Sequence, residues 1–217
     1  MALRTAEAIS PSILWIDEIE KGFAGSTGAG DSGTSSRVFG TFLTWMQEKA
    51  RPVFVIATAN SIDQLPPEFL RKGRFDEVFF VDLPTRTERR QILELHIRRR
   101  ITSPEAAGDF ALDEVVLDQL VELSEGYSGA EIEQSTVVAL FEAFAEQRSV
   151  QAEDFARALS TMVPLSVTQA EQIRATREWA NVRAIAATSH EDRTDYEHTT
   201  STDSDVRTSR GGRTVDF

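Results

Sequence analysis

A short apolar run that ends in two acids constrains the fold of this chain more than any other stretch. Residues Ile13 to Ile16 (ILWI) carry no polar side chain, which is typical of a strand buried on both faces of a parallel sheet. Asp17 and Glu18 follow at once. Open α/β folds bind ligands at the carboxyl edge of the sheet, so this pair is expected at a ligand site. The alternative is a buried strand that ends in two solvated acids.

A second strand of the same kind is predicted over Val53 to Ala57, and it leads to Thr58 and Asn60. Between the two strands, apolar residues recur at helical spacing from Ser36 until Pro52 ends the pattern. The two strands therefore present polar residues at the same edge of one parallel sheet.

A third strand is predicted over Glu77 to Val81, and a helix follows whose start carries a capping box of Thr85 and Glu88. This alternation of strands and helices predicts a parallel α/β layer over residues 1–100. The Gly/Ser/Thr-rich stretch from Gly22 to Ser36 has no hydrophobic anchor and is expected to be a mobile loop.

Residues 101–185 show helical periodicity only and predict a small domain of four amphipathic helices, the last reaching about Ile185. Two further helix starts are predicted from capping boxes, Ser128 with Glu131 and Thr168 with Glu171. Residues 186–217 contain almost no hydrophobic side chain, and Ser, Thr, Asp and Arg dominate. Such a composition predicts a disordered tail.

The composition excludes several classes of function. The net charge of −12 would repel duplex DNA and anionic membranes, so neither is expected as a direct partner. The absence of cysteine excludes disulfides, thiolate metal sites and cysteine nucleophiles. No apolar run approaches the roughly 20 residues that span a bilayer, and no signal peptide opens the chain. We expect a cytoplasmic or organelle-stroma location.

Five motifs follow one another along the chain: LWIDE, VIATAN, FLRKGRFDEVFFVDLP, ELHIRRR and GYSGAEIE. In this order and spacing they resemble the AAA family of P-loop ATPases, from the second half of its large α/β subdomain through its helical lid. The chain looks most like the uncharacterised AAA proteins of hypothetical reading frames in chloroplasts and cyanobacteria. The resemblance covers about Ala2 to Ile185.

The resemblance implies roles in nucleotide hydrolysis for the polar residues of the first two motifs. LWIDE is similar to a Walker B motif, in which Asp17 would organise Mg²⁺ and Glu18 would polarise the attacking water. Asn60 would contact the γ-phosphate of ATP and the water, because an amide both donates and accepts hydrogen bonds. Taken by itself, Asn60 is more readily explained as the cap of a turn.

The resemblance also implies contacts from the later motifs. Arg71 and Arg74 match paired arginine fingers, whose charged guanidinium groups reach the nucleotide of a neighbouring subunit. Fingers of this kind imply a homo-oligomeric ring, expected to be a hexamer. His96 would contact the base and ribose, and Gly129 and Ala130 would bring backbone close to adenine. The alternatives are a solvated arginine face, a core histidine and an ordinary helix start.

One part of the family's machinery has no counterpart in these residues. A P-loop ends in Gly-Lys-Ser/Thr, and no lysine here follows a glycine. The family's sheet has the order 5-1-4-3-2, and the chain supplies strands three to five only. Without the first strand, a gap of roughly 10 Å with unpaired backbone is expected between Val53–Ala57 and Glu77–Val81. The fold class is therefore an incomplete P-loop NTPase core followed by a helical lid.

We infer two alternative functions from this pattern. As the C-terminal portion of a complete AAA protomer, the chain would take part in Mg²⁺-dependent ATP hydrolysis coupled to remodelling of an unidentified protein. By itself it is expected to hydrolyse little or no ATP. The alternative is a non-enzymatic accessory chain that binds AAA subunits, or a truncated relic that does not fold stably.

Overall fold

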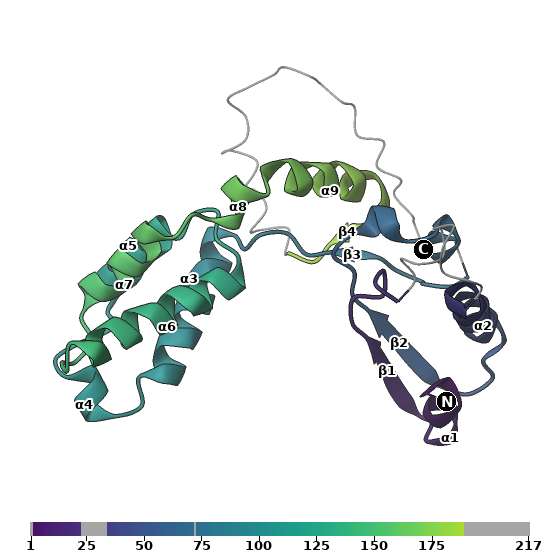
Figure 1. Ribbon diagram of the computed structural model, residues 1–217, viewed down its shortest axis with the longest axis horizontal. Helices are drawn as coiled ribbons and strands as arrows, with labels where there is room; N and C mark the ends of the chain where they lie inside the picture. The colour runs from purple at the N-terminus through teal and green to yellow at the C-terminus, as the bar shows by residue number, and fades with distance from the viewer. Residues whose placement is uncertain (1, 23–33, 72, 189–217) are drawn as a thin grey trace, which may run out of the picture. The chain divides into compact units, whose positions relative to one another are not determined.

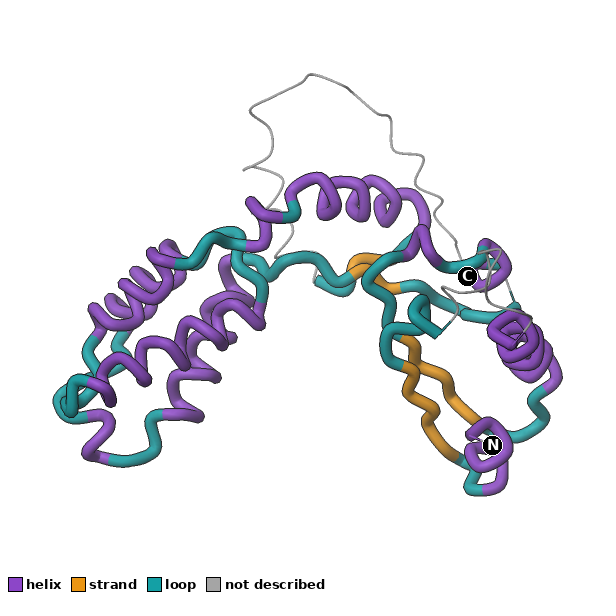
Figure 2. Tube along the Cα trace, viewed as in Figure 1, coloured by secondary structure: helices purple, strands orange, loops and turns teal. Residues whose placement is uncertain are grey.

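The computed structural model describes residues 2–22, 34–71 and 73–188, and these divide into two compact units. Unit 1 is Met1–Val78 and unit 2 is Phe79–Phe217. The helices and strands of each are labelled in Figure 1 and coloured by type in Figure 2. Within the described residues, no helix is both long enough and apolar enough to span a bilayer.

Unit 1 is a two-stranded parallel sheet with flanking helices. Its elements are α1 (Ala2–Ala8), β1 (Ser12–Ile16), α2 (Thr34–Glu48), β2 (Val53–Ala57) and two short 3-10 turns, Ile62–Gln64 and Pro67–Leu70. Ser12 lies opposite Val53 and Ile16 opposite Ala57, which confirms the predicted parallel pairing. Helix α2 begins at Thr34, two residues before its predicted start, and residues 23–33 of the predicted loop lie outside the described residues.

Only one face of this sheet is covered by the described residues. Ile16 and Val55 pack against a cluster of buried side chains from α2 and the segments that follow the strands. These are Ile19, Phe42, Leu43, Met46, Leu65 and Phe69. On the opposite face, Ile13, Trp15 and Phe54 are each more than 60% exposed. Burial on both faces, as predicted, is therefore wrong for these residues, because side chains of a strand alternate between faces and only one face has a helix layer.

Unit 2 consists of helices and one minimal sheet. Its elements are β3 (Phe79–Phe80), α3 (Arg86–Arg100), α4 (Pro104–Ala107), α5 (Glu114–Leu123), α6 (Gly129–Ala145), α7 (Ala152–Thr161), α8 (Leu165–Thr168), α9 (Ala170–Arg183) and β4 (Ile185–Ala186). The capping boxes predicted at Thr85 and Ser128 are both confirmed, at the starts of α3 and α6.

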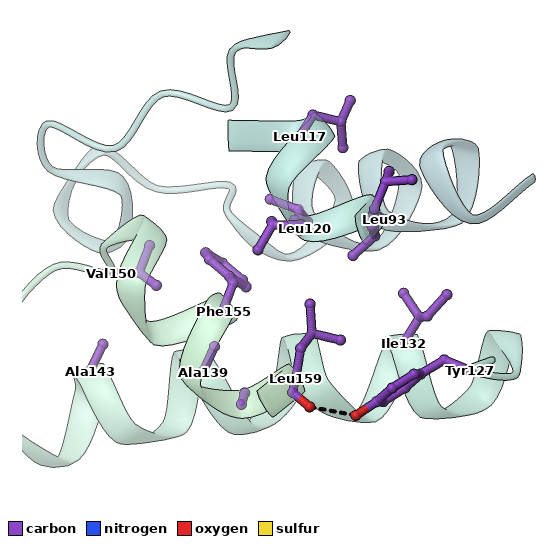
Figure 3. Close-up of a cluster of buried hydrophobic side chains, with 13 residues drawn as sticks. Leu93, Leu117, Leu120, Tyr127, Ile132, Ala139, Ala143, Val150, Phe155 and Leu159 are labelled. Carbon is purple, nitrogen blue, oxygen red and sulfur yellow. Dashed lines mark hydrogen bonds between the residues drawn. The ribbon is translucent and has the colours of Figure 1, made fainter. Parts of the chain in front are cut away.

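The core of unit 2 lies between α3, α5, α6 and α7 (Figure 3). Leu93 and Ile97 of α3 are 1% exposed in this core, and Ile132 and Phe155 are as deeply buried. Because α3 contributes these side chains, the chain divides before β3, whereas the sequence suggested a boundary after Arg100.

A buried tyrosine joins this core to the end of α7. The Tyr127 hydroxyl lies within hydrogen-bond distance of the carbonyl oxygens of Leu159 and Met162. Its ring is 3% exposed, and burial raises the pKa of the phenol above its ordinary value. The hydroxyl therefore stays protonated and can donate to either carbonyl.

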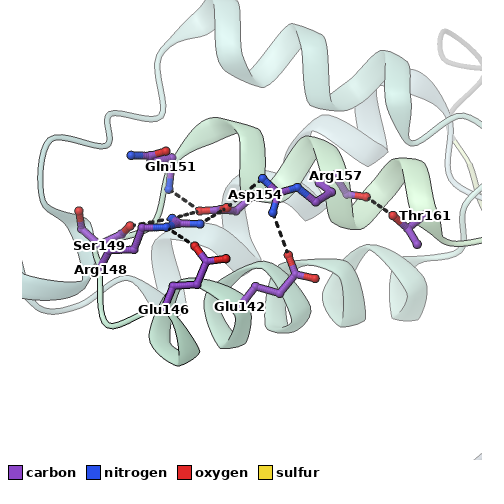
Figure 4. A network of polar contacts seen from close by, with 8 residues as sticks. All are labelled: Glu142, Glu146, Arg148, Ser149, Gln151, Asp154, Arg157 and Thr161. Carbon is purple, nitrogen blue, oxygen red and sulfur yellow. Dashed lines mark hydrogen bonds and ion pairs between the residues drawn. The ribbon is translucent and has the colours of Figure 1, made fainter.

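An ion pair between a buried carboxylate and a partly exposed arginine closes the turn between α6 and α7 (Figure 4). Asp154, which is fully buried, accepts two bonds from the Arg148 guanidinium at 2.6 and 2.7 Å. It also accepts the backbone N–H of Gln151 at 2.9 Å. The bonds from Arg148 lower the pKa of the Asp154 carboxyl, although burial opposes the shift. The pair thus holds a charged carboxylate at the start of α7.

Three predictions for this unit are corrected. The strand expected over Glu77–Val81 shrinks to β3, which pairs in parallel with β4 instead of belonging to the larger sheet. Its partner is Ile185–Ala186, which the sequence placed at the end of the last helix and in the tail. Residues 189–217 of that predicted tail lie outside the described residues.

The third correction concerns the helix start predicted at Thr168. Thr168 is the last residue of α8, and α9 starts at Ala170 with Gln169 as a cap that makes no side-chain bond. An N-cap residue needs an extended backbone, and a residue inside a helical turn cannot provide one. The expected capping box with Glu171 is therefore absent at this position.

Candidate nucleotide site

The carboxyl edge of the β1–β2 sheet gathers polar side chains from both strands. Asp17 and Glu18 follow β1, and Thr58 and Asn60 follow β2. The ladder continues past the strands, since the Thr58 N–H donates to the Ile16 carbonyl at 2.9 Å. We call Asp17, Glu18, Thr58 and Asn60 the sheet-edge cluster, and parallel pairing is the reason that its members meet.

The Thr58 hydroxyl orders the two acids. It donates to Asp17 Oδ1 at 2.5 Å and accepts the backbone N–H of Glu18 at 3.0 Å. Glu18 has a φ of 48°, in the left-handed region that residues other than glycine rarely adopt. The hydroxyl therefore supports a local backbone conformation that turns the chain directly after Asp17.

Asn60 bonds to the glutamate that the sequence assigned to water activation. Its side-chain amide donates to Glu18 Oε1 at 3.0 Å, so the two residues predicted to act together lie in direct contact. Lys21 donates to the other oxygen, Oε2, at 2.6 Å. That bond to Glu18 raises the pKa of the Lys21 ammonium. Both oxygens of the Glu18 carboxylate thus have donors.

Three residues of this edge have roles that the sequence analysis did not assign: Thr58, Glu20 and Lys21. Glu20 is 2% exposed, and its Oε1 accepts the backbone N–H of Asn60 at 3.0 Å. Its Oε2 is buried and has no hydrogen-bond partner among the described residues. The sequence signal for two of these residues was their position, since Glu20 and Lys21 follow Glu18 by two and three residues.

The two predicted arginine fingers lie elsewhere in unit 1. Arg71 is exposed and ends the turn Pro67–Leu70. Arg74 is half-buried, and its guanidinium donates to the backbone carbonyl of Glu68. In the described part of unit 1, neither guanidinium bonds to the sheet-edge cluster.

The residues predicted to contact the base lie in unit 2, where α3 meets α6. His96 is on α3, and its Nδ1 lies 3.0 Å from a guanidinium nitrogen of Arg100. Gly129 and Ala130 form the first turn of α6. A Cβ at Gly129 would lie 3.7 Å from Ile92 Cδ1 of α3, so the two helices approach closely at this point. The backbone N–H groups of a first helical turn have no partner within the helix.

The carboxylate oxygens at the sheet edge are suitable ligands for a magnesium ion that is bound together with a nucleotide. Within the described residues, no three His, Asp or Glu side chains assemble into a metal site. Mg²⁺ usually takes one or two protein carboxylates, and phosphates and waters complete its shell. Thr58 engages one oxygen of Asp17, so the exposed Asp17 carboxylate has the chemistry for such an ion.

Comparison with known proteins identifies the family. The family model described as "ATPase family associated with various cellular activities (AAA)" matches residues 1–83, which include the whole sheet-edge cluster. The "uncharacterized AAA domain-containing protein ycf46" of Pyropia yezoensis is 48% identical over 178 residues. The chain belongs to the AAA family. The aligned segment is 82% of this chain and 35% of the relative.

Other AAA proteins are more distant. The "cell division cycle protein 48 homolog" of Archaeoglobus fulgidus is 33% identical over 60% of this chain and 17% of its own length. The crystal structure of the FIGL-1 AAA domain in complex with ADP superposes with a TM-score of 0.67, at 22% identity, over 84% of this chain and 61% of that one. This likeness confirms the α/β fold with its helical part. The chain spans about a third of the length of its ycf46 relatives.

Proposed function

We propose that this chain is the C-terminal portion of an AAA ATPase protomer, which binds ATP with Mg²⁺ and hydrolyses it to ADP and phosphate when the protomer is complete. The observation that carries the proposal is the contact between Asn60 and Glu18 at the edge of a parallel sheet, directly beside Asp17. The family membership and the ADP-bound structural neighbour support nucleotide binding.

Each member of the cluster has a distinct task in this proposal. The Asp17 carboxylate would hold Mg²⁺, and the ion would supply positive charge beside the phosphate oxygens. Glu18 polarises the attacking water. Asn60 positions that water beside Glu18, because its amide N–H donates to the Glu18 carboxylate and its amide oxygen can accept a hydrogen bond from the water. Thr58 keeps both acids at the edge. The phosphate-binding Gly-Lys-Ser/Thr segment would have to come from outside these 217 residues.

The test is Glu18→Gln in the full-length protein. Glutamine keeps the shape and the bond to Asn60 but cannot polarise water as a carboxylate does, so hydrolysis should fall at least about 100-fold while ATP binding persists. Glu48→Gln, a change at an exposed glutamate that ends α2, is the matched control. Unchanged turnover in Glu18→Gln would remove Glu18 from catalysis.

The proposal extends to a ring, expected to be a hexamer, in which Arg71 and Arg74 reach a neighbour's nucleotide and hydrolysis remodels an unidentified protein. Arg71 is the cleaner probe because it is exposed, whereas Arg74 supports the local backbone through Glu68. Mixing two inactive variants, Arg71→Ala and Glu18→Gln, should restore part of the activity, because the intact site of one meets the intact arginine of the other. Mixed assemblies that stay inactive would argue against fingers in trans.

A second candidate function is a non-enzymatic chain that binds AAA subunits. The missing Gly-Lys-Ser/Thr segment favours it, since these residues by themselves have no phosphate cradle. The mass of the polypeptide in its source cell separates the two. A mass well above 24.1 kDa would favour the ATPase, and a mass of 24.1 kDa the accessory chain. The cytoplasmic or stromal location stays a prediction.

A further inference from the structure

Three charged or titratable side chains form a chain of contacts where α3 meets α6. The Arg100 guanidinium lies 3.0 Å from His96 Nδ1, and its other terminal nitrogen donates to Glu133 Oε1. His96 Nδ1 is 3.7 Å from the same Glu133 oxygen. The side chains of His96 and Arg100 are 17% and 25% exposed, so both are largely enclosed by the unit.

The chemistry of arginine decides which ring nitrogen of His96 carries the proton. A guanidinium has donors only and stays charged in proteins. His96 Nδ1 must therefore accept the hydrogen bond, and the proton of the neutral ring lies on Nε2. Glu133 keeps Arg100 in place, and the bond from Arg100 lowers the pKa of the Glu133 carboxyl, although burial opposes the shift.

We propose that Arg100 and Glu133 are positioning residues that hold His96 as the Nε2–H tautomer, so that His96 offers a nucleotide one hydrogen-bond donor. The use of this donor rests on the proposed function. A donor at this place selects an acceptor on the ligand, namely a ring nitrogen of the base or an oxygen of the ribose, and disfavours an amino group. Gly129 of α6 lies close to Ile92, which is one helical turn before His96 on α3.

The tautomer is measurable without any nucleotide. In this 217-residue chain with His190→Gln and His198→Gln, His96 is the remaining histidine, and ¹⁵N NMR of its neutral ring reports the position of the proton. The unaltered site should show Nε2–H only. Arg100→Ala should move the ring toward Nδ1–H, because the Glu133 carboxylate then remains 3.7 Å from Nδ1 as an acceptor.

Two further variants keep this test decisive. Arg99→Ala removes the exposed neighbouring arginine and should leave the His96 signal unchanged. If Arg100→Ala does not fold, Arg100→Met keeps the apolar stem and removes every donor, so it carries the same expectation. An Nδ1–H ring or a mixture in the unaltered site would overturn the proposal. So would an unchanged signal in the Arg100 variants.

The functional half is tested in the full-length protein by ATP hydrolysis. Arg100→Met should raise KM for ATP roughly 3- to 10-fold, the effect of one weakened hydrogen bond, and leave kcat within about twofold; Arg99→Met should change neither. If Glu18→Gln abolishes turnover and Arg100→Met leaves KM unchanged, the proposed function stands and this inference falls. If the unaltered protein neither binds nor hydrolyses ATP, the proposed function falls together with the nucleotide role of His96.

Discussion

The two units differ in how much of their apolar surface is buried by their own described residues. The described part of unit 2 encloses a core of thirteen buried residues, supplied by helices that are close together in the sequence and by the turns between them. In the described part of unit 1, a cluster of six buried residues lies on one side of the sheet, and Ile13, Trp15 and Phe54 are largely exposed on the other. A helix makes its backbone hydrogen bonds internally and needs only a neighbour that covers its apolar face. A strand of a parallel sheet needs neighbouring strands at both edges for its hydrogen bonds and covering layers on both faces. The helical unit is therefore the more self-sufficient of the two.

The largest effect is expected in the core of unit 2. Phe155 is 2% exposed and its ring lies 5.2 Å from that of Phe110. Phe155→Ala should lower the free energy of unfolding of this unit by about 3–5 kcal/mol, because it removes a buried ring and leaves a cavity. Urea titration followed by circular dichroism measures the loss. A loss below about 1 kcal/mol would mean that the core collapses around the site and would weaken the contrast between the units.

The ion pair between Arg148 and the buried Asp154 should give the next largest effect. Asp154→Asn replaces a carboxylate that accepts two bonds from Arg148, and it should cost about 1.5–3 kcal/mol. The same unfolding titration measures it. Asp118→Asn, at an exposed carboxylate that also bonds to an arginine, is the matched control and should cost much less.

The pH dependence of this pair has a defined sign. The pKa of the folded Asp154 carboxyl is lowered from its ordinary value of 3.8, chiefly by the bond to Arg148. Its contribution is complete above the unfolded pKa, at about pH 4, and is lost as the pH falls through the lower folded value. Unit 2 of the unaltered chain should therefore lose stability in this acid range, and Asp154→Asn should lose less. Parallel pH curves for the two proteins would contradict the assignment.

A smaller effect is expected at the edge of the sheet in unit 1. Thr58→Val keeps the branched shape but removes the hydroxyl that bonds to both Asp17 and the Glu18 backbone. The cost should be about 1–2 kcal/mol, because the Glu18 N–H loses its acceptor. Thermal unfolding of unit 1, with Thr44→Val on the exposed side of α2 as control, measures it. An effect equal to that of the control would show that Thr58 does not order the acids.

The smallest effect is expected on the exposed face of the sheet, where the comparison between the units is sharpest. Trp15 is 61% exposed, and Trp15→Thr keeps strand propensity, so the stability of the 217-residue chain should change by no more than about 0.5 kcal/mol. The same substitution in the full-length protein decides whether the face is covered there. A cost of several kcal/mol in that protein would mean that residues beyond this chain bury Trp15.

Local signals predicted the elements that depend on near neighbours. Thr85 with Glu88 and Ser128 with Glu131 marked the starts of α3 and α6, because a capping box is complete within four residues. The positions of β1 and β2, their parallel pairing and the placement of Asp17, Glu18 and Asn60 at one sheet edge were also predictable, since short apolar runs followed by polar residues are typical of parallel strands.

Contacts between distant residues were not predictable in the same way. The pairing of β3 with Ile185–Ala186 spans about half the chain, so no local sequence signal marks it. Thr168 looked like a helix cap until the preceding turn proved to be helical. The role of Glu20 depends on where the Asn60 N–H points, which only the folded edge decides.

The amino-acid sequence by itself determined the class of fold, the order of its motifs and the chemistry of the residues at the sheet edge, because these depend on residue type and on spacing along the chain. Only the tertiary structure decided which donors meet which acceptors: Thr58 with Asp17, Asn60 with Glu18, and Arg100 with Glu133. A hydrogen bond requires two groups within about 3 Å, and residues far apart in the sequence reach that distance only when the chain is folded.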